Sequence, residues 1–188
     1  MINIQGQYKG YELKPSSNRT VVIVYVNPYK AEAPNLPITF IGEEAEALVE
    51  QVLDALPENT SVRITARIRT REYQGRVFAD LQGVNLVPST EALQPAVEGV
   101  LIGQLINPTP IEGRKGTFYR YDLVSPFLTH PLSVTVSDQV DPELLYRVEL
   151  FVRTREYQGR VYTDYNVQKY APSGLRAKAA ELTEAVPF

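Results

Sequence analysis

The sequence predicts an all-β protein with one helix, in which two five-stranded barrels follow each other along the chain. The segment RTREYQGRV occupies 69–77 and returns letter for letter at 153–161. Agreement over nine positions indicates an internal duplication, which fixes the architecture. Outside one stretch with helical spacing, short apolar-alternating runs lie between Gly and Pro residues. Such runs are typical of strands.

The composition is that of a folded protein without cysteine chemistry. Hydrophobic residues make up 44% and charged residues 22% of the 188 positions, which is ordinary for a globular chain. Cysteine is absent, which excludes disulfides, thiolate nucleophiles and thiolate metal sites. No apolar run approaches the ~20 residues of a membrane span. The first residues do not resemble a signal peptide, so we expect a cytoplasmic protein.

The first copy contains five predicted strands and a helix. The helix, 43–56, has one apolar stripe and acidic residues in its first turns, which suits the helix dipole. Pro57 follows its end. The strands are Gln5–Leu13, Val21–Val26, Ile38–Ile41, Ser61–Arg71 and Arg76–Val87.

The second copy repeats this order after a predicted linker, 89–98. From the shared Gly to the shared Arg, the first copy spans 63 positions (6 to 69) and the second 50 (103 to 153). The missing stretch falls where the first copy has its helix, so 138–145 can form at most one or two turns. The predicted domains are therefore 1–88, with the helix 43–56, and 99–172, with the helix shortened or absent, followed by a tail, 173–188.

Five strands with a helix between the third and the fourth is the order of an OB-fold. We therefore predict two tandem OB-fold barrels. Such barrels bind single strands or oligosaccharides across the second and third strands, with the loops beside them closing over the ligand. On this layout the repeated segment forms the loop between the fourth and fifth strands.

The repeated segment also predicts a β-hairpin with Gln74-Gly75, or Gln158-Gly159, as its turn. Alternation places an apolar set on one face and arginines with aromatic residues on the other. Guanidinium groups hold phosphates, and aromatic rings stack on bases. The predicted nucleic-acid contacts of the two hairpins are Arg67, Arg69, Arg71, Tyr73, Arg76 and Phe78, and Arg153, Arg155, Tyr157, Arg160 and Tyr162.

A structural reading of the same hairpins stays open. They can be solvated edges whose arginines keep the protein soluble. Arg69 with Asp80, and Arg153 with Asp164, can form cross-strand ion pairs. The duplication of the whole Arg/Tyr/Arg pattern favours a shared task.

The second strand of the second copy adds candidate rings. Alternation places Tyr119 and Tyr121 on one face and Phe118 with Arg120 on the other. One pair belongs to the core, and the sequence does not say which. Tyr119 and Tyr121 complete the candidate binding set.

The formal net charge of −3 at first argues against a nucleic-acid binder. The distribution of the charge does not argue against one, because many of the acids lie together: 43–58 holds six acids and no base. The span 63–76 holds five arginines against Glu72 alone. A polyanion responds to such a local patch, because the Debye length is ~10 Å.

The chain ends in an acidic segment followed by Pro187-Phe188, with Glu181 and Glu184 as its acids. This terminus, after tandem barrels, resembles that of bacterial and phage-type single-stranded DNA-binding proteins. The resemblance implies a tip that docks on genome-maintenance enzymes, with the Phe188 ring in an apolar pocket and its carboxylate on a basic residue. It also implies a homodimer that presents four barrels. The acids here are more spread, and the tail is short and not rich in Gly or Gln.

Catalytic patterns are scarce. His130 is the only histidine and lies in a Thr-His-Pro loop, and no phosphate loop, HExxH or GxSxG pattern occurs. We expect no enzyme, cofactor or metal. The favoured function is sequence-tolerant binding and protection of single-stranded DNA in replication, recombination or repair. The alternatives are a structural or assembly protein that uses tandem barrels for protein contacts, and a binder of single-stranded RNA.

Overall fold

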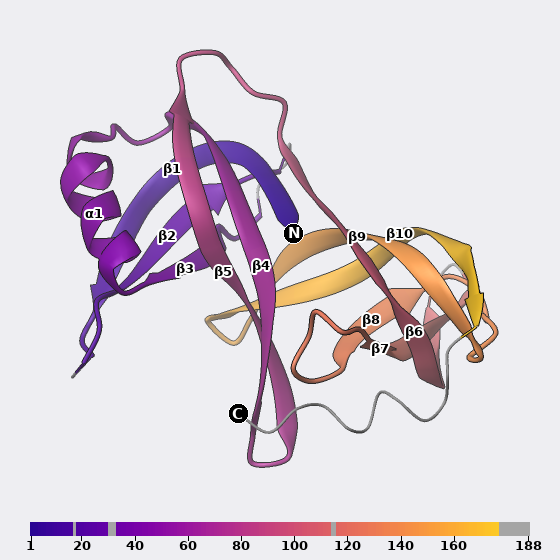
Figure 1. Cartoon of the computed structure of the whole chain (residues 1–188). Coiled ribbons are helices and arrows are strands. Elements are labelled where there is room, and N and C mark those ends of the chain that lie inside the picture. The colour runs from indigo at the N-terminus through magenta and orange to yellow at the C-terminus, as the bar shows by residue number, and fades with distance from the viewer. Residues whose placement is uncertain (17, 30–32, 114–115, 177–188) are drawn as a thin grey trace. The chain divides into compact units, whose positions relative to one another are not determined.

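The computed structural model describes residues 1–16, 18–29, 33–113 and 116–176. Strands dominate these residues, and one α-helix and one 3-10 helix accompany them (Figure 1). The predicted all-β class of OB-fold type is confirmed. The elements are β1 (Ile2–Lys14), β2 (Val21–Asn27), β3 (Leu36–Ile41), α1 (Glu43–Gln51), η1 (Leu53–Ala55), β4 (Ser61–Tyr73), β5 (Arg76–Ser89), β6 (Ala96–Gly113), β7 (Gly116–Val124), β8 (Leu132–Val136), β9 (Leu144–Tyr157) and β10 (Arg160–Arg176).

The strand pairing in the first half follows the OB-fold order. Its strands lie in the order β2-β3-β5-β4-β1, and a further pairing of β1 with β2 joins the two ends. β3 and β5 run parallel, whereas β1 is antiparallel to both β2 and β4. The first residues of β1 pair with β4 on one edge and with the start of β6 on the other, whereas its later residues pair with β2.

The second half repeats this order. Its strands lie in the order β6-β7-β8-β10-β9, and a further pairing of β6 with β9 joins the ends. β8 and β10 run parallel. Between β8 and β9 the chain makes bends and a hydrogen-bonded turn but no helix. The one or two helical turns that the sequence allowed in 138–145 are therefore absent from this segment. Two tyrosine hydroxyls fix this segment: Tyr121 accepts the Val140 N–H at 2.9 Å and Tyr146 the Asp141 N–H at 3.0 Å.

Equivalent irregularities mark the first strand of each copy. The register of β1 shifts between Tyr8 and Tyr11, and that of β6 between Ile106 and Thr109. Gly10 and Asn107, four residues after the shared glycines, have positive φ values of 105° and 54°. A β-bulge at the same place in both copies bends each strand.

The chain forms two compact units that interleave along the sequence. Unit 1 comprises 1–69, 79–99 and 152–164, and unit 2 comprises 70–78, 100–151 and the chain from 165 onward. We call 70–78 the first arm and 152–164 the second arm. Each arm is the outer part of one repeat's hairpin and belongs to the unit built mainly from the other repeat. The domain boundaries expected from the repeats stay a prediction; β6 begins at Ala96, inside the expected linker.

Each unit has its own core of alternating strand residues. In unit 1, side chains of β1, β2 and β4 that are at most 2% exposed include Ile4, Val24 and Ile64. In unit 2, Leu123 and Leu150 are fully buried. Burial at every second residue is the period of a strand with one face on the core.

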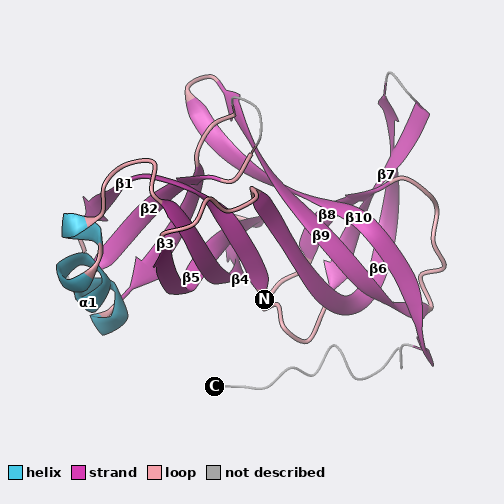
Figure 2. Cartoon of the chain, turned by 90° about the horizontal axis from the view of Figure 1, so that it is seen from above, coloured by secondary structure: helices cyan, strands magenta, loops and turns pink. Residues whose placement is uncertain are grey.

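The helix is shorter than predicted. α1 ends at Gln51, because Val52 turns out of helical geometry with φ −131° and ψ −60°. The 3-10 helix that follows directs Leu53 into the core, where it is 2% exposed, and α1 itself buries Ala45. The single apolar stripe over 43–56 is therefore divided into two short segments. Figure 2 shows the helical segment beside the strands of unit 1.

Candidate nucleic-acid interface

Both hairpins turn at the predicted residues. Gln74 and Gly75 have φ values of 52° and 72°, and Gln158 and Gly159 have 51° and 71°. Two consecutive positive φ values are the signature of a type I′ turn, which matches the twist of the flanking strands. The tip residues Tyr73 and Tyr157 therefore end one strand of each hairpin directly before the turn.

The predicted binding face is exposed in both arms. Tyr73 is 63% and Tyr157 57% exposed, and all the arginines of the predicted set are exposed. The opposite face is buried at Thr70 and Thr154, but it is exposed beyond them, at Val77 and Val161. The outermost part of each arm thus presents both faces to solvent.

An arginine lies over an aromatic ring at the same place in each arm. The Arg71 guanidinium carbon is 5.8 Å from the Phe78 ring centre, and that of Arg155 is 4.9 Å from the Tyr162 ring centre. These distances are those of cation–π pairs. The contact stacks a flat cation on a flat ring and orients both side chains.

In the second arm, Asp164 forms an ion pair with Arg155. Its Oδ2 accepts a hydrogen bond from Arg155 Nε at 2.7 Å. Arg153, the partner expected from the sequence, is directly opposite Asp164, and Arg155 reaches it as a diagonal neighbour. Asp164 therefore orients the same guanidinium that covers the Tyr162 ring.

The inner part of each arm is held by a threonine that is not among the predicted site residues. In unit 2, Thr70 Oγ1 donates to His130 O at 3.0 Å and accepts from His130 N at 2.8 Å. In unit 1, Thr154 Oγ1 donates to Pro34 O, and Tyr29 OH donates to Val152 O at 3.2 Å. Burial raises the pKa of Tyr29. The signal available in the sequence was a threonine on the apolar face, at the same position in both repeats.

Tyr121 is not available for stacking, which corrects its place in the predicted set. It is 1% exposed, and its hydroxyl accepts the Val140 N–H. Tyr119 is half-buried, with its ring centre 6.5 Å from that of Tyr121. Arg120, on the alternate face, is exposed. The sequence left open which of the two pairs belongs to the core. The structure answers this for Tyr121, which belongs to the core of unit 2.

His130 lies in a loop, as predicted, and is half-buried there. Its Nδ1 is 4.0 Å from Glu72 Oε2. Within the described ranges, no three or more His, Asp or Glu side chains are grouped as metal ligands would be. The predicted tip residues Glu181, Glu184, Pro187 and Phe188 lie outside the residues that the structure describes.

A membrane-crossing helix is not found in the part of the chain that the structure describes.

Comparison with known proteins shows a shared fold at low sequence identity. No protein-family model matches the sequence, and no curated protein matches it. Two solved structures of the single-stranded DNA binding protein from Thermus aquaticus match nearly the whole chain. A deletion mutant has a TM-score of 0.71, with 12% identity over 96% of this chain and 97% of that one. The wild-type protein has a TM-score of 0.70, with 12% identity over 98% and 97%. At this identity the likeness shows the fold alone.

Proposed function

We propose that the chain is a sequence-tolerant single-stranded DNA-binding protein built from two OB-fold barrels, and that the two arms contact the strand. The observation that carries the proposal is the repeated arrangement of an arginine held over an exposed ring, with a further exposed tyrosine at the tip. Exposed rings stack on any base, and guanidinium groups neutralise phosphates whatever the sequence. The fold shared with the Thermus aquaticus protein supports the proposal.

The proposed contacts in unit 1 come from the second arm and the outer face of β4. They are Arg67, Arg69, Arg153, Arg155, Tyr157, Arg160 and Tyr162. Those in unit 2 come from the first arm and β7, and are Arg71, Tyr73, Arg76, Phe78 and Tyr119. Protection of single strands in replication, recombination or repair follows as the role of such a protein.

The test is a fluorescence-anisotropy titration of labelled oligo(dT), with duplex DNA as competitor, at low and moderate salt. We expect tight, salt-sensitive binding of the single strand that the duplex does not displace. Tyr157→Ala should weaken it by at least about fivefold, because a stacked base contributes ~1–3 kcal/mol. Leu13→Ala removes an exposed side chain, 55% accessible, from β1 of the same unit and is the control. Unchanged affinity in a variant that combines Arg155→Ala and Tyr157→Ala would refute the proposal.

We further propose that the C-terminal tip recruits genome-maintenance enzymes and that the protein acts as a homodimer. The support is the terminal Pro187-Phe188 with Glu181 and Glu184 before it. Deletion of Phe188 should leave oligo(dT) binding unchanged. The same deletion should abolish binding to an enzyme that recognises the Pro-Phe tip of bacterial single-stranded DNA-binding proteins, measured with a labelled peptide of residues 177–188. Equal binding of the shortened peptide would contradict this assignment.

A second candidate is an assembly protein, favoured by apolar residues exposed on β5. Val84 is 39% and Val87 49% exposed, and such side chains suit a protein contact. Salt separates the two candidates, since polyanion binding weakens steeply with salt and apolar association does not. A mass in solution that grows with concentration, without oligo(dT) binding, would favour assembly. Competition between oligo(rU) and oligo(dT) decides between RNA and DNA.

A further inference from the structure

The loop between β7 and β8 holds one aromatic ring in solvent. Phe127 is 71% exposed, more than any other large apolar side chain in the described ranges. An exposed ring of this size gives up the stabilisation that burial of an apolar side chain supplies. The side chain therefore contributes little to the fold and is accessible to another molecule.

The exposure does not come from a loosely held loop. Ser125 is 5% exposed, and its Oγ donates to Ile102 O at 2.7 Å. The same oxygen accepts the Phe127 N–H at 3.4 Å, and Leu128 N donates to Ser125 O at 3.1 Å. A buried hydroxyl thus fixes the backbone at the residue that carries the ring.

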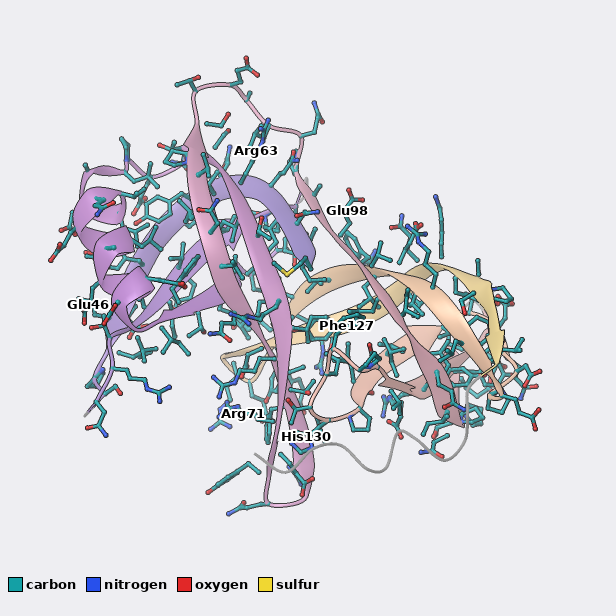
Figure 3. All side chains as sticks on the ribbon, viewed as in Figure 1. Glu46, Arg63, Arg71, Glu98, Phe127 and His130 are labelled. Atoms are coloured by element: carbon teal, nitrogen blue, oxygen red, sulfur yellow. The ribbon has the colours of Figure 1, made fainter. Side chains whose placement is uncertain are left out.

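The first arm is attached to the same loop. Thr70 contacts both backbone groups of His130, three residues after Phe127. Beyond Thr70 the arm carries Arg71 and Tyr73, which the proposed function assigns to the DNA. Phe127, His130 and Arg71 are labelled in Figure 3, and all three belong to unit 2. The threonine contact therefore ties the loop with the exposed ring to the arm with the proposed contacts.

The equivalent residue of the first copy shows what is different about Phe127. Val26-Asn27-Pro28-Tyr29 corresponds to Val124-Ser125-Pro126-Phe127. Asn27 Oδ1 accepts the Tyr29 N–H at 3.0 Å, as Ser125 Oγ does for Phe127. Tyr29 is half-buried and its hydroxyl donates to Val152 O of the second arm. Phenylalanine has no hydroxyl for such a bond, and the Phe127 ring remains exposed.

We propose that Phe127 is a base-stacking residue of unit 2, which extends the interface of the first arm onto the β7–β8 loop. The ligand is an unpaired nucleotide of a single strand. The flat face of its base matches the exposed ring, and the phosphates of the strand contact the arginines of the arm. The two units then differ, because Tyr29 donates a hydrogen bond to the arm in unit 1, whereas Phe127 stacks on a base in unit 2. This inference rests on the proposed function.

The chain has no tryptophan, so Phe127→Trp supplies a single indole at the proposed contact. We expect oligo(dT) to quench its emission with the same midpoint as the anisotropy titration. An oligomer of abasic deoxyribose phosphate should leave the emission unchanged, because it has no base to stack. Leu13→Trp on β1 is the control and should respond to neither.

Affinity provides the second readout. Phe127→Ala should weaken oligo(dT) binding by at least about fivefold and leave the urea midpoint unchanged, since the side chain is exposed. If the arm variants weaken binding, but Phe127→Ala does not and the indole emission does not change, this inference is wrong while the proposed function stands. If the wild-type protein does not bind oligo(dT), the proposed function fails first.

Discussion

At the scale of single residues, the two threonines of the repeat have matching partners. Pro34 lies two residues before β3, which begins at Leu36, and His130 lies two residues before β8, which begins at Leu132. Thr70 and Thr154 therefore bond equivalent loops. A buried hydroxyl needs such a partner, because losing its hydrogen bonds to water is costly. The partner is a backbone group, so the contact places no demand on the side chain of the loop.

Thr70→Val is expected to lower the free energy of unfolding by ~1–3 kcal/mol, because it leaves an N–H and a carbonyl of His130 without their partner. Thr154→Val should cost less, since only the Pro34 carbonyl loses its donor. Urea unfolding measures both. Thr65→Val, on the half-buried outer side of β4, is the matched control. An unchanged midpoint for Thr70→Val would show that the hydroxyl does not hold the arm.

Replacing a single arginine of the arm should change the salt dependence of binding. Arg155→Gln removes one phosphate contact under the proposed function. The slope of log K against log salt should then become less steep by about 0.7, the value for one single-strand phosphate. Arg147→Gln provides the comparison, because Arg147 lies on β9 outside the arms and pairs with Glu149 at 2.5 Å. Equal slopes for the two variants would place Arg155 outside the interface.

The sequence predicted the exposed face of the arms because strand alternation is a local rule. It did not predict the partners of Thr70 and Thr154, since these lie in distant loops and contact backbone atoms that carry no residue signature. Tyr121 was misassigned for a related reason. The sequence does not show whether a tyrosine hydroxyl is hydrogen-bonded to water or, as at Tyr121, to the N–H of Val140.

At the scale of elements, the hairpin is set by its turn. Gly159 has φ 71°, and a Cβ placed there would meet nothing within 4 Å. Any cost of a side chain at this position is therefore conformational and not steric. The same holds for Gly75, with φ 72°.

Gly159→Ala should destabilise the second hairpin by ~1–2 kcal/mol, because the left-handed conformation is strained for alanine. Gly159→Asn should lose less, since asparagine tolerates this region. Amide hydrogen exchange of the second arm reports the effect locally, and oligo(dT) affinity should fall with it. Equal protection in the two variants would mean that the turn does not control the arm.

Helix length was the least predictable element. Periodicity extended the helix to 56, but Val52 interrupts it, and the next apolar residue reaches the core through a 3-10 turn. Apolar spacing alone cannot distinguish a continuous helix from two short segments that bury the same residues. In the second copy the shortened spacing correctly indicated a reduced segment, and Tyr121 and Tyr146 fix what remains.

At the scale of the whole molecule, the compact units do not coincide with the repeats. If the sequence is divided at 89–98, the second arm, 152–164, falls in the C-terminal half. It nevertheless belongs to unit 1, which is built mainly from the N-terminal half. The strand order followed from the pattern of elements. The exchange of the arms did not, because it depends on which loops the hairpins reach in three dimensions.

Separate halves, 1–94 and 95–188, should therefore fold poorly alone and regain structure when mixed. Each half lacks the arm that belongs to its unit, and the first half also loses the pairing of β1 with the start of β6. Amide NMR spectra of each half and of the mixture measure this. A dispersed spectrum and a cooperative unfolding transition for either half alone would contradict it.

The exchange of arms also bears on which parts of the two repeats can differ in sequence. Each arm contacts a loop of the other repeat through a threonine hydroxyl and backbone groups, so the arm must keep its threonine while the loop can vary in sequence. The helix, which lies between β3 and β4 of one repeat, has no counterpart in the described segment between β8 and β9. On this account the nine identical residues include the one whose hydroxyl each unit receives from the other repeat.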